Sequence, residues 1–99
     1  MMRVRLLKSA RRDLDGIYDY WATRSGPEVA GDLIYSITDI IPTIAEFPLA
    51  GRACNEILDG LRVFPIGKYL IYYRKERSEI KILHILHGAR NQARALRSN

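Results

Sequence analysis

The chain has 99 residues, of which 47% are hydrophobic and 27% are charged. This composition is typical of one globular domain, and it excludes a membrane span, which needs roughly 20 consecutive apolar residues. The formal net charge of +5 and the isoelectric point near 9.7 favour an acidic partner: nucleic acid, an acidic protein surface or an acidic peptide.

The N-terminal part predicts a strand followed by a helix. Residues 3–7 alternate in polarity with a period of two, as in a strand. Ser9 is a residue type that caps helices, and a helix is predicted from there to about Arg24. Its apolar stripe at helical spacing consists of Leu14, Ile17, Tyr18 and Trp21. Gly16 should cost this helix about 1 kcal/mol relative to alanine, so we expect another element to pack closely against it.

A second helix is predicted from Pro27, because proline suits the first position of a helix. Its apolar face is broader than one core contact requires, so two partners could share it. The face consists of Val29, Ala30, Leu33, Ile34, Ile37, Ile40, Ile41 and Ile44. Pro42 removes a backbone donor, which predicts a kink in a helix that continues to Glu46.

The second half of the chain predicts strands. Residues 49–60 contain glycines and have no clear period, which indicates an ordered connection. Residues 61–66, 69–74 and 79–87 are β-branched and aromatic with short spacers, as in an antiparallel meander. The whole order predicts an α+β fold in one domain over residues 1–99. An N-terminal strand and a two-helix hairpin pack on an antiparallel sheet that the C-terminal meander completes.

Cysteine usage and the N-terminus bear on the compartment. Cys54 is the only cysteine, so no intrachain disulfide and no cysteine-based metal cage can form. Residues 1–8 are basic, but their apolar run is too short for a signal peptide. We therefore expect a cytoplasmic protein, with no membrane association, metal site or cofactor.

Several short motifs follow one another through nearly the whole chain. They are Ser9-Ala10-Arg11-Arg12-Asp13-Leu14, Pro48-Leu49-Ala50-Gly51-Arg52, Gly60-Leu61-Arg62, Tyr69-Leu70-Ile71-Tyr72-Tyr73 and His84-Ile85-Leu86-His87-Gly88-Ala89-Arg90. In this order and spacing they resemble the ParE branch of the RelE/ParE superfamily of type II toxin-antitoxin and plasmid stabilisation proteins. The resemblance implies a small α+β fold, a cognate ParD-like antitoxin in a hetero-oligomer with the toxin, and inhibition of DNA gyrase by binding.

An alternative function comes from the related RelE branch, which cleaves messenger RNA on the ribosome. Metal-free RNA cleavage needs proton transfer and cationic groups around the phosphate, and His87 and Arg62 would supply them here. No Tyr, His, Trp or Phe follows His87, which departs from the nuclease pattern. The sequence therefore favours binding over catalysis and leaves a metal-independent endoribonuclease as the alternative.

The two histidines are expected to differ. His84 shares a strand face with Ile80, Ile82 and Leu86, which predicts a packed, hydrogen-bonded core residue. His87 lies three residues further on, so it should point to the opposite face, and the two cannot jointly hold a metal. At the strand end His87 either bonds the turn or contacts a target.

Two binding surfaces are predicted. The first surface should contact the toxin's target, which is either an acidic protein surface or DNA. It consists of Arg62, His87, Arg90 and Arg94. Arg62 could equally be solvated or capping, whereas Arg52 is expected to bond carbonyls of its own connection. The antitoxin should lie along an apolar groove formed by Leu33, Ile34, Ile37 and Ile41.

Overall fold

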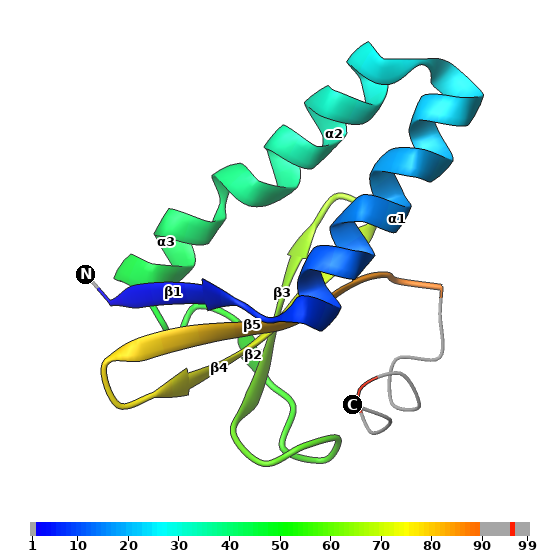
Figure 1. Ribbon diagram of the computed structural model, residues 1–99. Coiled ribbons are helices and arrows are strands. Elements are labelled where there is room, and N and C mark those ends of the chain that lie inside the picture. The colour runs from blue at the N-terminus through cyan, green and yellow to red at the C-terminus, as the bar shows by residue number, and fades with distance from the viewer. Residues whose placement is uncertain (1, 90–95, 97–99) are drawn as a thin grey trace.

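The computed structural model describes residues 2–89 and residue 96. The elements follow the predicted order, and the α+β fold is confirmed. They are β1 (Arg3–Leu6), α1 (Lys8–Ser25), α2 (Pro27–Asp39), α3 (Ile41–Glu46), β2 (Arg52–Ala53), β3 (Leu61–Ile66), β4 (Tyr69–Glu76) and β5 (Glu79–His87). The helices α1 and α2 form a hairpin that extends beyond the sheet, and α3 returns the chain to it beside β1 (Figure 1).

The five strands form one sheet in the order β1-β5-β4-β3-β2. The meander β3-β4-β5 is antiparallel as predicted, but β1 pairs parallel to β5, with Val4 opposite Ile80. The prediction of a purely antiparallel sheet was therefore wrong at β1. The short strand β2 was not predicted, because its two residues, Arg52 and Ala53, are too few to show a period.

Where β1 ends, Leu7 and the first turns of α1 take over the hydrogen bonding to the backbone of β5. The Leu7 amide donates to the Ile82 carbonyl at 3.0 Å, and Ser9 Oγ donates to the Leu83 carbonyl at 2.6 Å. Asp13 Oδ2 then accepts from the Ile85 amide at 2.9 Å. Ser9 therefore does not cap α1, which begins at Lys8 without a side-chain cap, because its hydroxyl is bonded to the strand.

A β-bulge changes the facing of side chains in β5. The register shifts between Tyr72 and Tyr73 of β4, so β5 has one residue more than its partner there. Ile82 and Ile85 consequently pack in one core cluster, while Leu86 packs in the other. The prediction that one face holds Ile80, Ile82 and Leu86 was wrong, because the two-residue period stops at the bulge.

His84 lies at this bulge and is a packed, hydrogen-bonded core residue, as predicted. Its residue exposure is 8%, and its Nδ1 lies 2.7 Å from Asp13 Oδ2. Asp13 thus joins both the side chain of His84 and the backbone of Ile85 to α1.

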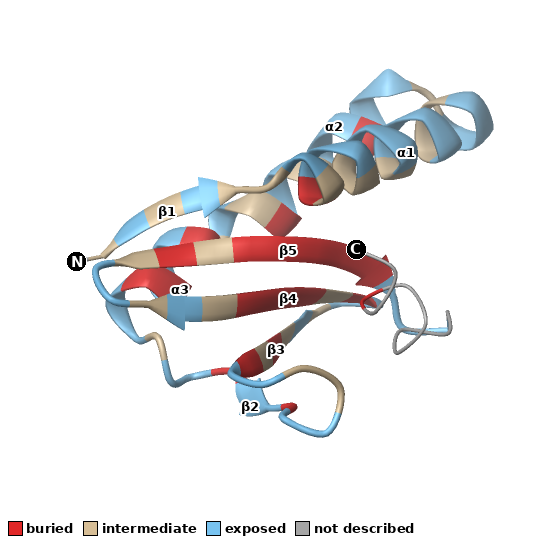
Figure 2. Cartoon of the chain, turned by 60° about the horizontal axis from the view of Figure 1, so that its bottom comes forward, coloured by how far each residue is buried: buried red, intermediate tan, exposed pale blue. Residues whose placement is uncertain are grey.

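Two hydrophobic clusters cover the two faces of the sheet. The larger one packs the helices against the sheet and includes Ala10, Ile37, Ile44, Tyr69, Ile71, Tyr73, Ile80, Ile82 and Ile85. The second contains Cys54, Leu61, Val63, Tyr72, Leu83, Leu86 and Leu96. Strand β5 is accordingly buried along most of its length, and β4 chiefly between Tyr69 and Tyr73 (Figure 2). Burial raises the pKa of the Cys54 thiol, which favours its protonated form.

The predicted kink at Pro42 is instead a break between two helices. Helix α2 ends at Asp39 and α3 begins at Ile41, so Pro42 lies in the first turn of α3. Proline has no amide hydrogen to donate to the carbonyl four residues earlier, which explains why α2 does not continue. Within residues 2–89, no helix has the length and apolarity needed to cross a membrane.

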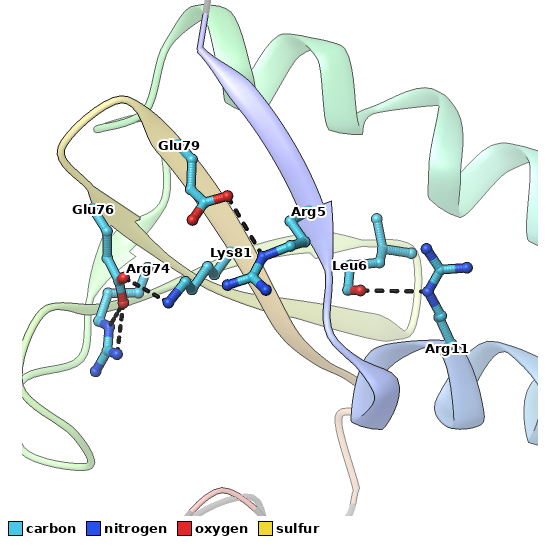
Figure 3. Close-up of polar contacts among 7 residues, drawn as sticks. All are labelled: Arg5, Leu6, Arg11, Arg74, Glu76, Glu79 and Lys81. Atoms are coloured by element: carbon cyan, nitrogen blue, oxygen red, sulfur yellow. Dashed lines mark hydrogen bonds and ion pairs between the residues drawn. The ribbon is translucent and has the colours of Figure 1, made fainter.

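Charged side chains fasten the free end of the β4-β5 hairpin (Figure 3). The Glu76 carboxylate lies 2.8 Å from Lys81 Nζ and 2.6 Å from Arg74 Nη2. Hydrogen bonds from Lys81 and then Arg74 lower the pKa of Glu76. Arg5 on β1 lies 3.5 Å from Glu79 on β5, so the parallel pair is also bridged at the surface.

We expect replacement of Asp13 by alanine to lower the free energy of unfolding by about 2–3 kcal/mol, because the partly buried Ile85 amide and His84 ring lose a charged acceptor. Urea denaturation measures this. Asp19→Ala is the matched control, since Asp19 is exposed on the same helix and has no hydrogen bond within the described residues; its effect should stay within about 0.5 kcal/mol. Equal effects of the two substitutions would contradict the role given to Asp13.

Candidate functional site

A hollow of about 500 Å³ lies between α1 and the C-terminal end of β5; we call it the α1-β5 hollow. Its wall on α1 is made by Arg12, Asp13, Gly16, Ile17, Tyr20 and Trp21. Its wall on the sheet is made by Tyr69, Ile85 and His87. Because Asp13 ties α1 to β5 at one end, the hollow opens where the helix leaves the sheet.

Aromatic side chains are fixed in this hollow by mutual contacts. Trp21 Nε1 donates to the Tyr69 hydroxyl at 2.9 Å. The rings of Tyr69 and His87 meet edge to face at a centroid distance of 5.4 Å, and Trp21 meets Tyr20 in the same way at 5.4 Å. Part of the hollow is therefore lined by aromatic side chains that contact one another.

His87 shows one of the two roles left open by the sequence, the hydrogen bond to the turn. Its Nδ1 accepts a hydrogen bond from the Ala89 amide at 3.1 Å, so it bonds the turn after β5. The residue is nevertheless exposed and lines the α1-β5 hollow. An acceptor at Nδ1 places the proton of the neutral ring on Nε2.

Gly16 contradicts the prediction of close packing. No heavy atom of the described residues lies within 4 Å of the position where a Cβ would stand, apart from the helix's own backbone and chain neighbours. Gly16 instead forms part of the hollow's wall. Its lack of a side chain keeps the hollow open.

Arg62 is engaged within the chain. Its Nη1 donates to the Gly51 carbonyl at 2.7 Å and to the Leu49 carbonyl at 3.4 Å. Arg52 is exposed; its Nη1 donates to the Ala53 carbonyl at 3.5 Å and lies 3.9 Å from Glu56. The expectation that Arg52 bonds a carbonyl of its own connection is therefore confirmed, and Arg62 bonds two further carbonyls there.

The structure does not bring Arg62 and His87 together. Arg62 is paired with Tyr73 and His87 with Tyr69, which are four residues apart on β4. At about 3.3 Å per residue this separates the two by roughly 13 Å along the sheet. They cannot act on one phosphate as the base and cation of the nuclease alternative. Within the described part of the chain, no group of three His, Cys, Asp or Glu residues could hold a metal ion.

The arginines assigned to the target from the tail, Arg90 and Arg94, lie outside the described residues. Arg12, Trp21 and Tyr69 line the α1-β5 hollow but were not among the site residues predicted from the sequence. The unusual glycine inside α1 was the available signal, since four-residue spacing places Arg12, Gly16 and Tyr20 on one helix face.

The residues expected to bind an antitoxin differ in accessibility. Ile37 and Ile41 are 1% and 8% exposed and belong to the chain's own core. Leu33 and Ile34 are half-buried, and Ile34 lines a second hollow of about 430 Å³ with Leu6, Leu14, Asp15 and Tyr18. We call this the α1-α2 hollow.

The motif residues around Gly51 hold the connection to the sheet. The Tyr73 hydroxyl donates to the Pro48 carbonyl and accepts from the Gly51 amide, both at 2.8 Å. A Cβ on Gly51 would lie 2.6 Å from that hydroxyl, so only glycine fits. Burial raises the pKa of the Tyr73 phenol, so it stays protonated and able to donate.

Comparison with protein families gives a match over residues 4–92 to the family described as the ParE toxin of the type II toxin-antitoxin system, parDE. Toxin ParE1 of Caulobacter vibrioides is 34% identical over 91 residues, covering 92% of this chain and 94% of the relative. Toxin ParE3 of the same organism is 29% identical and covers 97% and 96%, respectively. Toxin ParE1 of Mycobacterium tuberculosis is 30% identical, with 86% and 88% covered.

Among solved structures, the chain is similar to one from the chromosomal ParDE TA system of P. aeruginosa. The TM-score is 0.78 and the sequence identity 27%, over 88% of this chain and 96% of that one. The same architecture therefore recurs in a relative of modest sequence identity.

We expect Tyr73→Phe to lower the free energy of unfolding by about 1–3 kcal/mol, because the buried Gly51 amide loses its acceptor. Thermal and urea denaturation measure the change. Tyr35→Phe removes the same atom from a side chain that is 68% exposed, and should leave stability within about 0.5 kcal/mol of the wild type. If the Tyr73→Phe protein were as stable as the Tyr35→Phe protein, the hydrogen bonds between Tyr73 and the backbone of Pro48 and Gly51 would not hold the connection.

Proposed function

The chain belongs to the ParE toxin family of type II toxin-antitoxin systems, and we propose that it inhibits DNA gyrase by binding and is neutralised by a cognate ParD-like antitoxin. The observation that carries the proposal is the family match over residues 4–92, supported by the likeness to a chain of a ParDE system. Binding rather than catalysis is supported by the separation of Arg62 and His87 along the sheet.

The antitoxin surface in this proposal is the α1-α2 hollow with the adjoining face of α2. Ile34 supplies its apolar wall, and Leu33 is the other accessible member of the predicted set. Ile37 and Ile41 support this surface from beneath, since they are buried. An acidic antitoxin segment also complements the net charge of +5.

The target surface in this proposal begins at His87 and continues into the tail with Arg90 and Arg94. His87 is exposed at the end of β5, where its ring also packs on Tyr69. Arg62 contributes by holding the connection, because its guanidinium already bonds the Gly51 and Leu49 carbonyls.

The first experiment incubates the purified toxin with gyrase, supercoiled DNA and ATP, followed by detergent and protease. We expect linear DNA, because a toxin that traps gyrase on cleaved DNA releases broken ends when the enzyme is digested. Toxin premixed with its antitoxin is the control and should give none. Absence of linear DNA, with cleavage of ribosome-bound messenger RNA in a parallel sample, would replace the proposal with the nuclease alternative.

A second experiment separates the antitoxin surface from the core. Ile34→Glu should leave the toxin folded and active on gyrase but weaken antitoxin binding by at least about tenfold, because a charge enters the apolar hollow. Isothermal titration calorimetry measures the affinity. Ser36→Glu adds the same charge to an exposed position of α2 and is the control. Unchanged affinity of the Ile34→Glu toxin would show that the antitoxin binds elsewhere.

A further inference from the structure

Gly16 has a cost inside α1 that no contact within the described chain explains. Glycine in a helix interior is less favourable than alanine by about 1 kcal/mol, and close packing is the usual compensation. Here the space over Gly16 is empty and open to the α1-β5 hollow. Because none of the described residues fills this space, it leaves room for a partner that approaches α1.

Gly16 belongs to an exposed row of residues on α1. Arg12, Gly16, Tyr20 and Arg24 follow one another at four-residue spacing and are all exposed. We call them the α1 row. Along one side of it runs the hollow with its fixed aromatic lining of Trp21, Tyr69 and His87.

Two guanidinium groups stand at the ends of the α1 row. At 1.5 Å per residue, the backbones of Arg12 and Arg24 are about 18 Å apart along the helix axis. Neither lies within ion-pair distance of a carboxylate of the described residues, and Arg24 covers the Tyr20 ring at 4.5 Å. Their charges are therefore available to carboxylates of a partner.

We propose that the α1 row and the α1-β5 hollow seat an acidic helix of gyrase. An apolar side chain of that helix enters the hollow over Gly16, and carboxylates toward its two ends pair with Arg12 and Arg24. Glycine allows the partner backbone to come close to α1, and the aromatic lining desolvates the inserted side chain. The inference rests on the proposed function and names the surface by which this toxin holds its target.

The position of the hollow favours the target over the antitoxin as occupant. The α1-α2 hollow uses Leu14, Asp15 and Tyr18, which lie on the side of α1 opposite to the row. The α1-β5 hollow instead includes His87, where the predicted target surface begins. One toxin could thus present separate sides of α1 to its two partners.

The test fills the hollow without disturbing the fold. Gly16→Leu places an apolar side chain in the empty space, and leucine favours the helix, so the melting temperature should rise. In the gyrase assay we expect the toxin concentration that gives half-maximal linear DNA to increase by at least about tenfold. This corresponds to the loss of affinity that is typical when one anchor contact is removed. Gly31→Leu is the control, since Gly31 also lies in a helix with nothing within 4 Å; it should change this concentration by less than about twofold.

A second pair of variants tests the charges. Arg12→Glu should raise the same half-maximal concentration by at least about tenfold, whereas Lys75→Glu makes an equal charge change at an exposed position of β4 and should not. Antitoxin affinity, measured in parallel, should be unchanged in both Gly16→Leu and Arg12→Glu.

The outcomes separate the two proposals. Linear DNA from wild-type and Gly16→Leu toxin at the same concentrations would overturn this inference and leave the gyrase function standing. Loss of antitoxin binding by Gly16→Leu with gyrase poisoning retained would also overturn it, and would give the hollow to the antitoxin. No linear DNA from the wild type would overturn the proposed function and this inference with it.

Discussion

The outer edge of β5 sets the arrangement of the molecule. β1 pairs only with the first half of this strand, and the backbone groups beyond Ile82 are partly buried and need partners. The segment after β1 supplies them: the Leu7 amide bonds the Ile82 carbonyl, and the Ser9 hydroxyl and Asp13 carboxylate of α1 bond the backbone of Leu83 and Ile85. Because these bonds fix the position of α1 against the sheet, they also fix where the helix separates from β5 and where the α1-β5 hollow opens.

The hydrogen bonds between β5 and the segment that contains Leu7, Ser9 and Asp13 form a first tether. A second tether fixes the long connection between α3 and β3. The Tyr73 hydroxyl, the Gly51 backbone and the Arg62 guanidinium form one hydrogen-bonded group over the sheet. These residues carry much of the resemblance to ParE proteins, as do Ser9, Asp13 and His84 at the other tether. In this chain several motif residues build the scaffold, while others in the same motifs, such as Arg12, Tyr69 and His87, line the α1-β5 hollow.

Sequence reasoning succeeded where a local pattern decides structure. The hairpin of α1 and α2 follows from apolar spacing and from Pro27, and the meander follows from β-branched strands with short turns. It failed where contacts with a segment distant in the sequence determine the local structure. Ser9 has the right chemistry for a helix cap, but its hydroxyl is taken by Leu83, more than seventy residues away.

The candidate site was harder to predict for the same reason. The bulge beside Tyr72 has no periodic signature, so the faces of β5 could not be assigned beyond Ile82. The broad apolar face predicted for the second helix did not reveal that Ile37 and Ile41 fill the chain's own core. The empty space over Gly16 depends on how far α1 diverges from β5, which only tertiary packing determines.

The hairpin of α1 and α2 projects from the sheet, so the lengths of these two helices can vary at the tip of the hairpin. Beyond Trp21 the end of α1 and the start of α2 pack on each other, as the buried Ala30 shows, while the tip around Gly26 stands away from the sheet (Figure 1). Gly26 has φ of 91°, which suits the reversal between the two helices. Evolution could lengthen or shorten both arms by whole helical turns, about 3.6 residues in each, without changing a strand or either tether. Diversification of such proteins by paired insertions should therefore concentrate at this tip.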